Sequence, residues 1–372
     1  MTDYTANTTL AAAADGLRRS ARVFITTHAK PDGDAYGSVV AMASALEQMG
    51  KQVQAVFMPP LPGCFRELLG TELYRVGMKE GTLERFDPDL VLVLDTGAWA
   101  QVSPLAEVLR PRIARMLIVD HHLSGDMPAP QRYIDGQAAA CCELVAQLLD
   151  ELGAEPDASP LGGTQRRCDP NPLFTPTVCQ ALFVGIASDT GWFRFSNTRP
   201  YTHELAARLQ RAGVDHAELY RQLEQTERRE KLALLTRALD SLELFADGAA
   251  ALMTLRAEDF TETGAMLEET ERIIDVPQIV SGVQVVALVT EPPPPPERPP
   301  ASTDDRGKGN GKDPAAIRLS FRSKPGPGAV DVAKLASQFG GGGHARAAGA
   351  KIRGSLREVR NKVAAALRNL PR

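Results

Sequence analysis

The sequence lacks a long apolar run, and this absence argues against a membrane-spanning helix. No hydrophobic stretch reaches the roughly 20 residues that a helix needs to cross a bilayer. Residues 1–14 also lack the basic start and apolar core of a secretory signal. We therefore expect a cytoplasmic protein with no membrane partner.

Cysteine is scarce, and no residue stands out as a covalent nucleophile. The five cysteines are an odd number, and their spacing matches no zinc pattern, so we expect reduced thiols. No serine or cysteine occupies a nucleophile elbow, which argues against a catalytic triad. The chemistry must therefore come from other side chains.

The net charge of −4 is unevenly distributed along the 372 residues. Residues 315–372 contain 12 Lys and Arg and 2 Asp and Glu, so they carry a net charge of +10. Residues 1–314 therefore carry a net charge of −14. An acidic cation-binding part and a basic part together suit a polyanionic substrate. For residues 353–372, the solvated face of a terminal helix explains the charge equally well.

Apolar runs and helical segments alternate in the first third of the chain. The runs lie at 22–27, 52–58, 90–94 and 116–119, and a helix is expected at 35–49. Continuous apolar runs joined by helices are typical of strands that are buried on both faces of a parallel sheet. We predict an α/β fold with a mostly parallel N-terminal sheet flanked by helices, a helical linker and a smaller C-terminal α/β domain.

The length of the chain favours more than one domain. We predict a catalytic domain over 1–200, a helical linker over 201–247 and a second domain over 248–372. Helices are expected at 138–152 and 178–188, a loop at 155–176, and strands at 250–255, 283–289 and 317–321. The proline-rich stretch 291–314 is expected to be a surface insertion, because a boundary there would leave only 58 residues for an independent core.

Acidic residues and histidines form four clusters, each of which follows an apolar run. They are His28, Asp32 and Asp34, then Asp95, then Asp120, His121 and His122, and finally Asp189. Each cluster alone is more typical of a turn or a helix cap. The carboxyl ends of parallel strands, however, meet at one edge of a sheet, where ligands bind. Such a set of carboxylates and imidazoles suits divalent cations such as Mn²⁺ and can hold two of them.

A glycine run at 340–343 stands out near the C-terminus. A flexible loop is the default explanation, but His344 and Arg346 follow the run, and Arg322 and Ser323 precede it. Glycine amides can approach phosphate closely, and arginine can bind phosphate through two hydrogen bonds. These residues predict a clamp for phosphate and nucleotide, with Arg346 at its periphery.

The order of these motifs resembles the DHH phosphoesterase superfamily. The segment 341–349, Gly-Gly-Gly-His-Ala-Arg-Ala-Ala-Gly, resembles the DHHA1 domain that accompanies it, together with Phe-Arg-Ser at 321–323. The short two-domain enzymes that degrade nano-RNA and 3′-phosphoadenosine 5′-phosphate (pAp) are the subgroup that the chain resembles. Tyr36 departs from the usual aliphatic residue, and we expect it to pack against the sheet.

The resemblance implies a role for each motif residue. His28 and Asp32 would bind one Mn²⁺, and Asp34, His121 and Asp189 would bind a second. Asp95 would bridge the two ions. Mg²⁺ or Co²⁺ could replace Mn²⁺. His122 would act on phosphate or assist protonation, and Asp120 would orient the histidines. Arg322, Gly342, Gly343 and His344 would bind the substrate's terminal nucleotide. Ser323, Gly341 and Arg346 are further candidates for substrate binding. The sequence leaves open whether His121 or His122 faces the metal.

These expectations lead to a main hypothesis and to rivals. The main one is a Mn²⁺-dependent phosphoesterase, an exoribonuclease and bisphosphate nucleotidase, that acts on short single-stranded RNA and on pAp. The enzyme rival is a phosphodiesterase for cyclic dinucleotides or pApA, and the rival from another class is a non-catalytic nucleotide-binding protein. A RecJ-type exonuclease and an inorganic pyrophosphatase fit less well, because each carries a different accessory domain. The resemblance also implies a homodimer.

Overall fold

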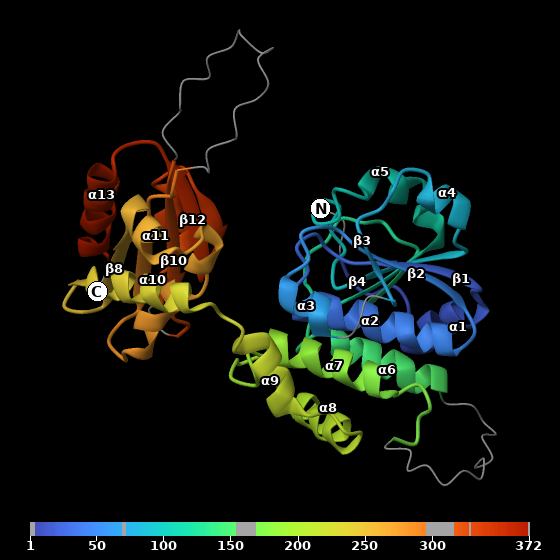
Figure 1. The fold of residues 1–372 in the computed structure, drawn as a ribbon. Coiled ribbons are helices and arrows are strands. Elements are labelled where there is room, and N and C mark those ends of the chain that lie inside the picture. The colour runs from blue at the N-terminus through green and yellow to red at the C-terminus, as the bar shows by residue number, and fades with distance from the viewer. Residues whose placement is uncertain (1–3, 69–71, 154–168, 295–315, 327–328, 371–372) are drawn as a thin grey trace, which may run out of the picture. The chain divides into compact units, whose positions relative to one another are not determined.

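The computed structural model describes residues 4–68, 72–153, 169–294, 316–326 and 329–370 (Figure 1). It separates into two compact units, Met1–Thr226 and Glu227–Arg372. The predicted loop at 155–176 and the predicted insertion at 291–314 lie mostly outside the described residues. Each helix of the described part is too short or too polar to span a membrane.

The first unit contains a sheet of six parallel strands among the described residues. The strands are β1 (Arg22–Thr26), β2 (Gln52–Phe57), β3 (Arg75–Val76), β4 (Leu90–Leu94), β5 (Met116–Asp120) and β6 (Gln131–Ile134). Its helices are α1 (Leu10–Arg19), α2 (Gly33–Gln48), α3 (Gly63–Leu68), α4 (Thr82–Phe86), α5 (Ala106–Leu109), η1 (Arg110–Arg115), α6 (Cys141–Gly153), α7 (Pro176–Asp189), α8 (Pro200–Arg211) and α9 (His216–Glu224).

Helices cover both faces of this sheet, as the continuous apolar strands predict. Leu92 of β4 packs into a core shared with α1, α2, α6 and α7, while its neighbour Val93 packs toward α5 on the opposite face (Figure 1). The strand order is β3-β2-β1-β4-β5-β6, so the direction of winding reverses between β1 and β4. Ligands bind at the carboxyl ends of the strands beside such a reversal.

The second unit is built on a mixed sheet with the order β11-β12-β10-β9-β8-β7. Its strands are β7 (Glu243–Phe245), β8 (Ala250–Leu255), β9 (Val285–Thr290), β10 (Ile317–Ser323), β11 (Gly342–His344) and β12 (Ala347–Ile352). Its helices are α10 (Arg229–Asp240), α11 (Ala257–Thr263), η2 (Leu267–Thr270), η3 (Ile273–Ile279), α12 (Val332–Ser337) and α13 (Leu356–Arg368).

The structure confirms the α/β fold class, a parallel N-terminal sheet flanked by helices and a smaller C-terminal α/β part. The predicted linker 201–247 is divided between the two units, since α8 and α9 belong to the first and α10 to the second. The three-part division of the chain therefore stays a prediction. Tyr36 packs against the sheet as expected, with its ring stacked on Phe57 of β2 and Phe65 of α3.

Part of the glycine run forms an edge strand, β11, rather than only a loop. Gly342 and His344 pair with β12 across a short hairpin. A Cβ atom at residue 341 would lie 2.1 Å from the carbonyl oxygen of Gly349, so only glycine permits this close approach. Tertiary pairing, not strand propensity, therefore determines the local structure here.

Candidate metal centre

The structure brings the six predicted metal ligands together at the carboxyl edge of the first sheet. Two groups of three have ligand atoms within 4.8 Å of one another: His28, Asp32 and Asp95, and Asp34, His121 and Asp189. The predicted bridging residue, Asp95, also groups with His121 and His122. The division into groups matches the ligand sets that the resemblance implies, although the roles themselves stay predictions.

Asp95 occupies the centre of the cluster. It follows β4 directly, adopts a positive φ of 61° and is almost completely buried. Its Oδ2 lies 3.4 Å from Nε2 of His28, and its Oδ1 lies 3.4 Å from Nε2 of His121. The two carboxylate oxygens therefore face two different histidines, which is the geometry that a bridging ligand requires.

Backbone contacts turn the Nε2 atoms of His28 and His121 toward the carboxylates. Nδ1 of His28 lies 3.1 Å from the carbonyl oxygen of Ala29, and Nδ1 of His121 lies 3.3 Å from that of Ala138. With Nδ1 donating to these carbonyls, Nε2 of each ring carries the free lone pair. This arrangement is the one expected of metal-ligating imidazoles.

Helix termini hold two of the carboxylates. Asp32 caps α2, and its Oδ1 accepts hydrogen bonds from the amides of Asp34 and Ala35. Asp34 is fully buried, and its carboxylate accepts hydrogen bonds from the amides of Cys141 and Cys142 at the start of α6. Both aspartates therefore also stabilise helix N-termini, so each has a structural role beside the predicted one.

The donor set suits divalent cations. The buried atoms Asp95 Oδ1 and His121 Nε2 form no hydrogen bond, although buried polar atoms nearly always do. Carboxylate oxygens and imidazole nitrogens are the ligands that Mn²⁺ and related cations take. The residues present therefore fit a metal, and the two orphaned atoms mark where its ligands meet.

The net effect of burial and neighbouring charges raises the pKa values of both Asp189 and His121 in the cluster. Burial disfavours the charged form of Asp189, and the nearby Asp34 carboxylate adds to the effect, so its pKa is raised to about 9. Burial of His121 opposes its protonation, but the Asp95 and Asp34 carboxylates prevail and raise its pKa to about 10. The metal-free cluster therefore holds protons that a cation would replace.

His122 differs from His121 in both burial and partner. Its side chain is 47% exposed, and Nδ1 lies 2.8 Å from Oδ1 of the buried Asp120, which also accepts the backbone amide of His122. The histidine whose Nε2 lies among the carboxylates is His121, at 3.3 Å from Asp189 Oδ2 and 3.8 Å from Asp34 Oδ2. The geometry therefore distinguishes the rings of His121 and His122, which the sequence alone could not do.

Sequence reasoning missed Tyr4. Its hydroxyl donates a hydrogen bond to Oδ2 of Asp120, at 2.6 Å. The ring lies where a Cβ at residue 97 or 125 would be, so glycine at both positions makes room for it. No sequence signal pointed to this residue, because it lies in a short N-terminal segment outside every motif.

The predicted nucleotide-binding residues divide into two groups in the second unit. Arg322 of β10 and His344 of β11 lie at the same level of the sheet, each beside Ala347 of β12. Ser323 and Arg346, in contrast, hold a loop together, since Ser323 donates to the carbonyl of Ala345 and Arg346 donates to that of Lys324. The contacts give these last two a structural role.

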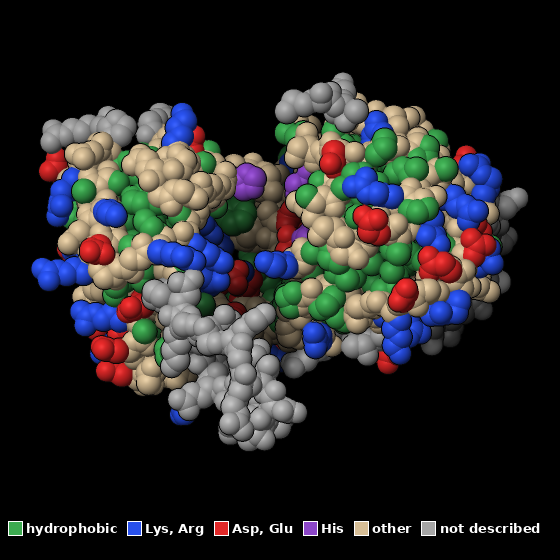
Figure 2. Space-filling view, turned by 90° about the horizontal axis from the view of Figure 1, so that it is seen from above, with side chains coloured by type: hydrophobic (Ala, Val, Ile, Leu, Met, Phe, Trp, Pro, Cys, Tyr) green, Lys and Arg blue, Asp and Glu red, His purple; other side chains and the backbone are tan. Residues whose placement is uncertain are grey.

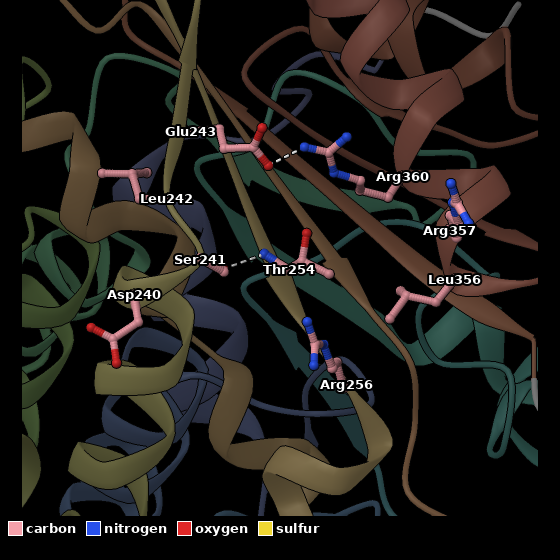
Figure 3. Close-up of a pocket in the computed structure, with 9 residues that line it drawn as sticks. All are labelled: Asp240, Ser241, Leu242, Glu243, Thr254, Arg256, Leu356, Arg357 and Arg360. Atoms are coloured by element: carbon pink, nitrogen blue, oxygen red, sulfur yellow. Dashed lines mark hydrogen bonds and ion pairs between the residues drawn. The ribbon is translucent and has the colours of Figure 1, made fainter.

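One pocket of the second unit lies apart from the predicted sites. A pocket of about 530 Å³ in the second unit contains no predicted site residue (Figure 3). Three arginines line it, and one of them, Arg360, forms an ion pair with Glu243. Basic and acidic side chains are also interspersed over the face shown in Figure 2. The cluster around Asp95 is recognised by its chemistry instead.

Comparison with known families agrees with this geometry. The model of the DHH family N-terminal domain matches residues 22–186. This range includes five of the six predicted metal ligands, and Asp189 lies just beyond it. The model of the DHHA1 domain matches residues 301–369. The chain therefore carries a DHH domain followed by a DHHA1 domain. This finding confirms the resemblance that the motifs predicted.

Similar proteins match most of the length of this chain. The bifunctional oligoribonuclease and PAP phosphatase NrnA of Thermus thermophilus is 27% identical over 332 residues, which are 89% of this chain and 84% of the relative. The protein with the same name from Bacillus subtilis is 25% identical over 89% of each chain. An exopolyphosphatase-related protein from Bacteroides fragilis shares the fold, with a TM-score of 0.74 at 20% identity over 96% of this chain and 95% of that one.

Proposed function

We propose that this protein is a Mn²⁺-dependent phosphoesterase that releases mononucleotides from short oligoribonucleotides and removes phosphate from pAp. The main support is the clustering of the six candidate ligands in overlapping groups, together with the unpaired buried atoms Asp95 Oδ1 and His121 Nε2. The names of the relatives in Thermus and Bacillus supply the substrate class. The match to the DHH domain model supports the coarser assignment of a metal-dependent hydrolase.

The ligands would form two sets around Asp95. His28 and Asp32 would hold one cation, Asp34, His121 and Asp189 would hold the other, and Asp95 would bind both. The chemistry that two bound cations supply is the activation of water and the neutralisation of charge on a phosphoryl group. Asp95 is held rigidly, since its backbone amide donates to the carbonyl of Val119 and its side chain is buried.

His122 would donate a proton to the leaving group. Its Nδ1 bonds to Asp120, which fixes the ring and leaves Nε2 outside this contact, on a side chain that is 47% exposed. The neighbouring Asp120 carboxylate is the largest cause that raises the pKa of His122 and so favours the protonated ring. A protonated Nε2 can donate to the oxygen that leaves phosphorus.

The test is hydrolysis by the purified full-length protein after removal of metal by a chelator. With added Mn²⁺ we expect mononucleotides from an adenylate dinucleotide and from a pentanucleotide, and inorganic phosphate from pAp. Mg²⁺ and Co²⁺ serve as alternative cations. No turnover of any of these substrates with any of the three cations would refute the proposal.

The same assay separates the rival functions. Faster turnover of pApA or cyclic di-AMP than of pAp and short RNA would favour the dinucleotide phosphodiesterase. Tight binding of pAp without turnover would favour a non-catalytic nucleotide-binding protein. The homodimer stays a prediction, which light scattering of the purified protein can check. The cytoplasmic location also stays a prediction, which cell fractionation can check.

A further inference from the structure

An open polar face lies beside the predicted nucleotide-binding residues in the second unit. On β10, Ile317, Leu319 and Phe321 are buried in the core under α12 and α13. Arg318, Ser320 and Arg322 alternate with them and therefore point to the opposite face of the sheet. On that face, the layer of α10, α11 and η3 buries residues of β8 and β9.

The strand register defines three levels on this face. His344 of β11, Ala347 of β12 and Arg322 of β10 form the first level, and Gly342, Gly349 and Ser320 form the second. Lys351 of β12 and Arg318 of β10 form the third. Residues that lie directly opposite in an antiparallel pair share a face, so the three levels form one continuous surface.

The far end of this surface is a basic cavity. It has a volume of about 520 Å³, and Arg318, Lys351, Ser320 and Gly341 are among the residues that line it. The described lining residues include no Asp, Glu or aromatic side chain. Arg318 and Lys351 are exposed, and neither forms an ion pair within the described part of the chain.

The spacing of the cationic groups suits a chain of phosphates. Arg318 and Arg322 are four residues apart on one strand, which corresponds to about 13 Å. One strand of nucleic acid can thus place one phosphate at Arg322 and another at the Arg318–Lys351 pair. The absence of aromatic rings from the described lining means that bases would not be read by stacking there.

We propose that Arg318 and Lys351 form a second phosphate subsite that binds the oligonucleotide beyond its terminal nucleotide. This inference rests on the proposed function and deepens it, because the subsite determines substrate length rather than base identity. An oligomer of several nucleotides reaches both ends of the surface, whereas pAp, a single nucleotide, reaches only one. The enzyme therefore distinguishes its two substrate classes by the contacts at Arg318 and Lys351.

The test compares two double variants of the full-length protein. The first is Arg318→Gln with Lys351→Gln. The control is Arg357→Gln with Lys362→Gln, which removes the same charges from exposed positions of α13. Because α13 packs on the Ile317 face of the sheet, the control does not touch the proposed subsite. Binding of a fluorescent adenylate pentanucleotide is measured by anisotropy, and hydrolysis of the pentanucleotide and of pAp is measured with Mn²⁺.

For the first variant we expect pentanucleotide binding to weaken about tenfold. The slope of log Kd against log salt should fall by about 0.7, since the pair contacts one phosphate and each phosphate contact on a single strand contributes about 0.7. The ratio of kcat/KM for the pentanucleotide to that for pAp should fall about tenfold. The control variant should leave the affinity, the salt slope and the ratio unchanged.

Two results would overturn the subsite. One is an unchanged salt slope and ratio in the first variant, and the other is an equal loss in the control. The binding arm needs no turnover, so it decides on the subsite even where the wild-type protein hydrolyses nothing. An inactive wild type whose pentanucleotide affinity still depends on Arg318 and Lys351 refutes the proposed function and supports the subsite.

Discussion

Tyr4 donates a hydrogen bond of 2.6 Å to Asp120, and this contact attaches the N-terminal segment to the centre of the candidate site. The other oxygen of Asp120 accepts from Nδ1 of His122. A continuous chain of hydrogen bonds thus runs from Tyr4 through Asp120 to His122. Burial is the main cause that raises the pKa of Tyr4, so its hydroxyl keeps its proton and stays a donor. We infer that Tyr4 is a positioning residue that acts through Asp120.

Tyr4→Phe should lower kcat about tenfold and leave KM and metal content nearly unchanged. The substitution removes one charge-assisted hydrogen bond and keeps the ring between Gly97 and Gly125. Tyr133→Phe is a matched control on the neighbouring strand β6, because it removes a hydrogen bond of 2.7 Å to Gln147. Steady-state kinetics and metal analysis of both variants check the inference. A loss in KM rather than kcat, or an equal effect of the control, would contradict it.

His121 and His122 should give different phenotypes although they are neighbours. His121→Gln removes the Nε2 atom that lies among Asp95, Asp34 and Asp189, so bound metal should fall together with activity. His122→Gln should keep bound Mn²⁺ close to the wild-type amount and lower kcat about 100-fold, the usual size of a lost general acid. Metal content after gel filtration, measured beside kcat, tests both. Metal loss in His122→Gln and not in His121→Gln would reverse the assignment.

Much of this site follows from the sequence because strand ends are predictable. His28, Asp95 and Asp120 each come at or just after the end of an apolar run, and parallel strands place their carboxyl ends at one edge. Tyr4 is not predictable in this way, since it lies 116 residues from its partner. The same holds for β11, whose glycines have little strand propensity and pair only because β12 is adjacent.

Asp189→Asn should strongly lower activity without destabilising the metal-free protein. Asp34, Asp32 and Asp95 lie near Asp189, and burial together with these carboxylates disfavours its negative charge. The neutral amide removes this repulsion but is a poorer metal ligand, so we expect kcat/KM to fall at least about 100-fold. The free energy of unfolding in chelator at pH 8 should equal or exceed that of the wild type. Urea titration measures it, and a clear loss of stability would count against the charge argument.

Arg208 connects the end of α6 to the segment that precedes α7. Its guanidinium forms paired hydrogen bonds with Asp169, at 2.6 and 2.9 Å, and with Asp150, at 2.7 and 2.8 Å. It also lies 3.8 Å from the ring centroid of Phe174. Burial alone would raise the pKa of Asp169, but the hydrogen bonds from Arg208 prevail and hold it below its ordinary value. The ionised form of Asp169 is therefore the one that stabilises the fold.

Asp169→Asn should accordingly destabilise the protein by about 2 kcal/mol at pH 7, because a buried charged hydrogen-bond pair is broken. The folded-state pKa is depressed, so this stabilisation is present above the unfolded pKa of about 4 and is lost as the pH falls through the folded value. The difference between variant and wild type should thus shrink as the pH falls below about 4. Asp150→Asn, at a more exposed partner, should cost about 0.5 kcal/mol. Urea unfolding across this pH range measures both, and a difference for Asp169→Asn that persists in acid would rule out the ionic explanation.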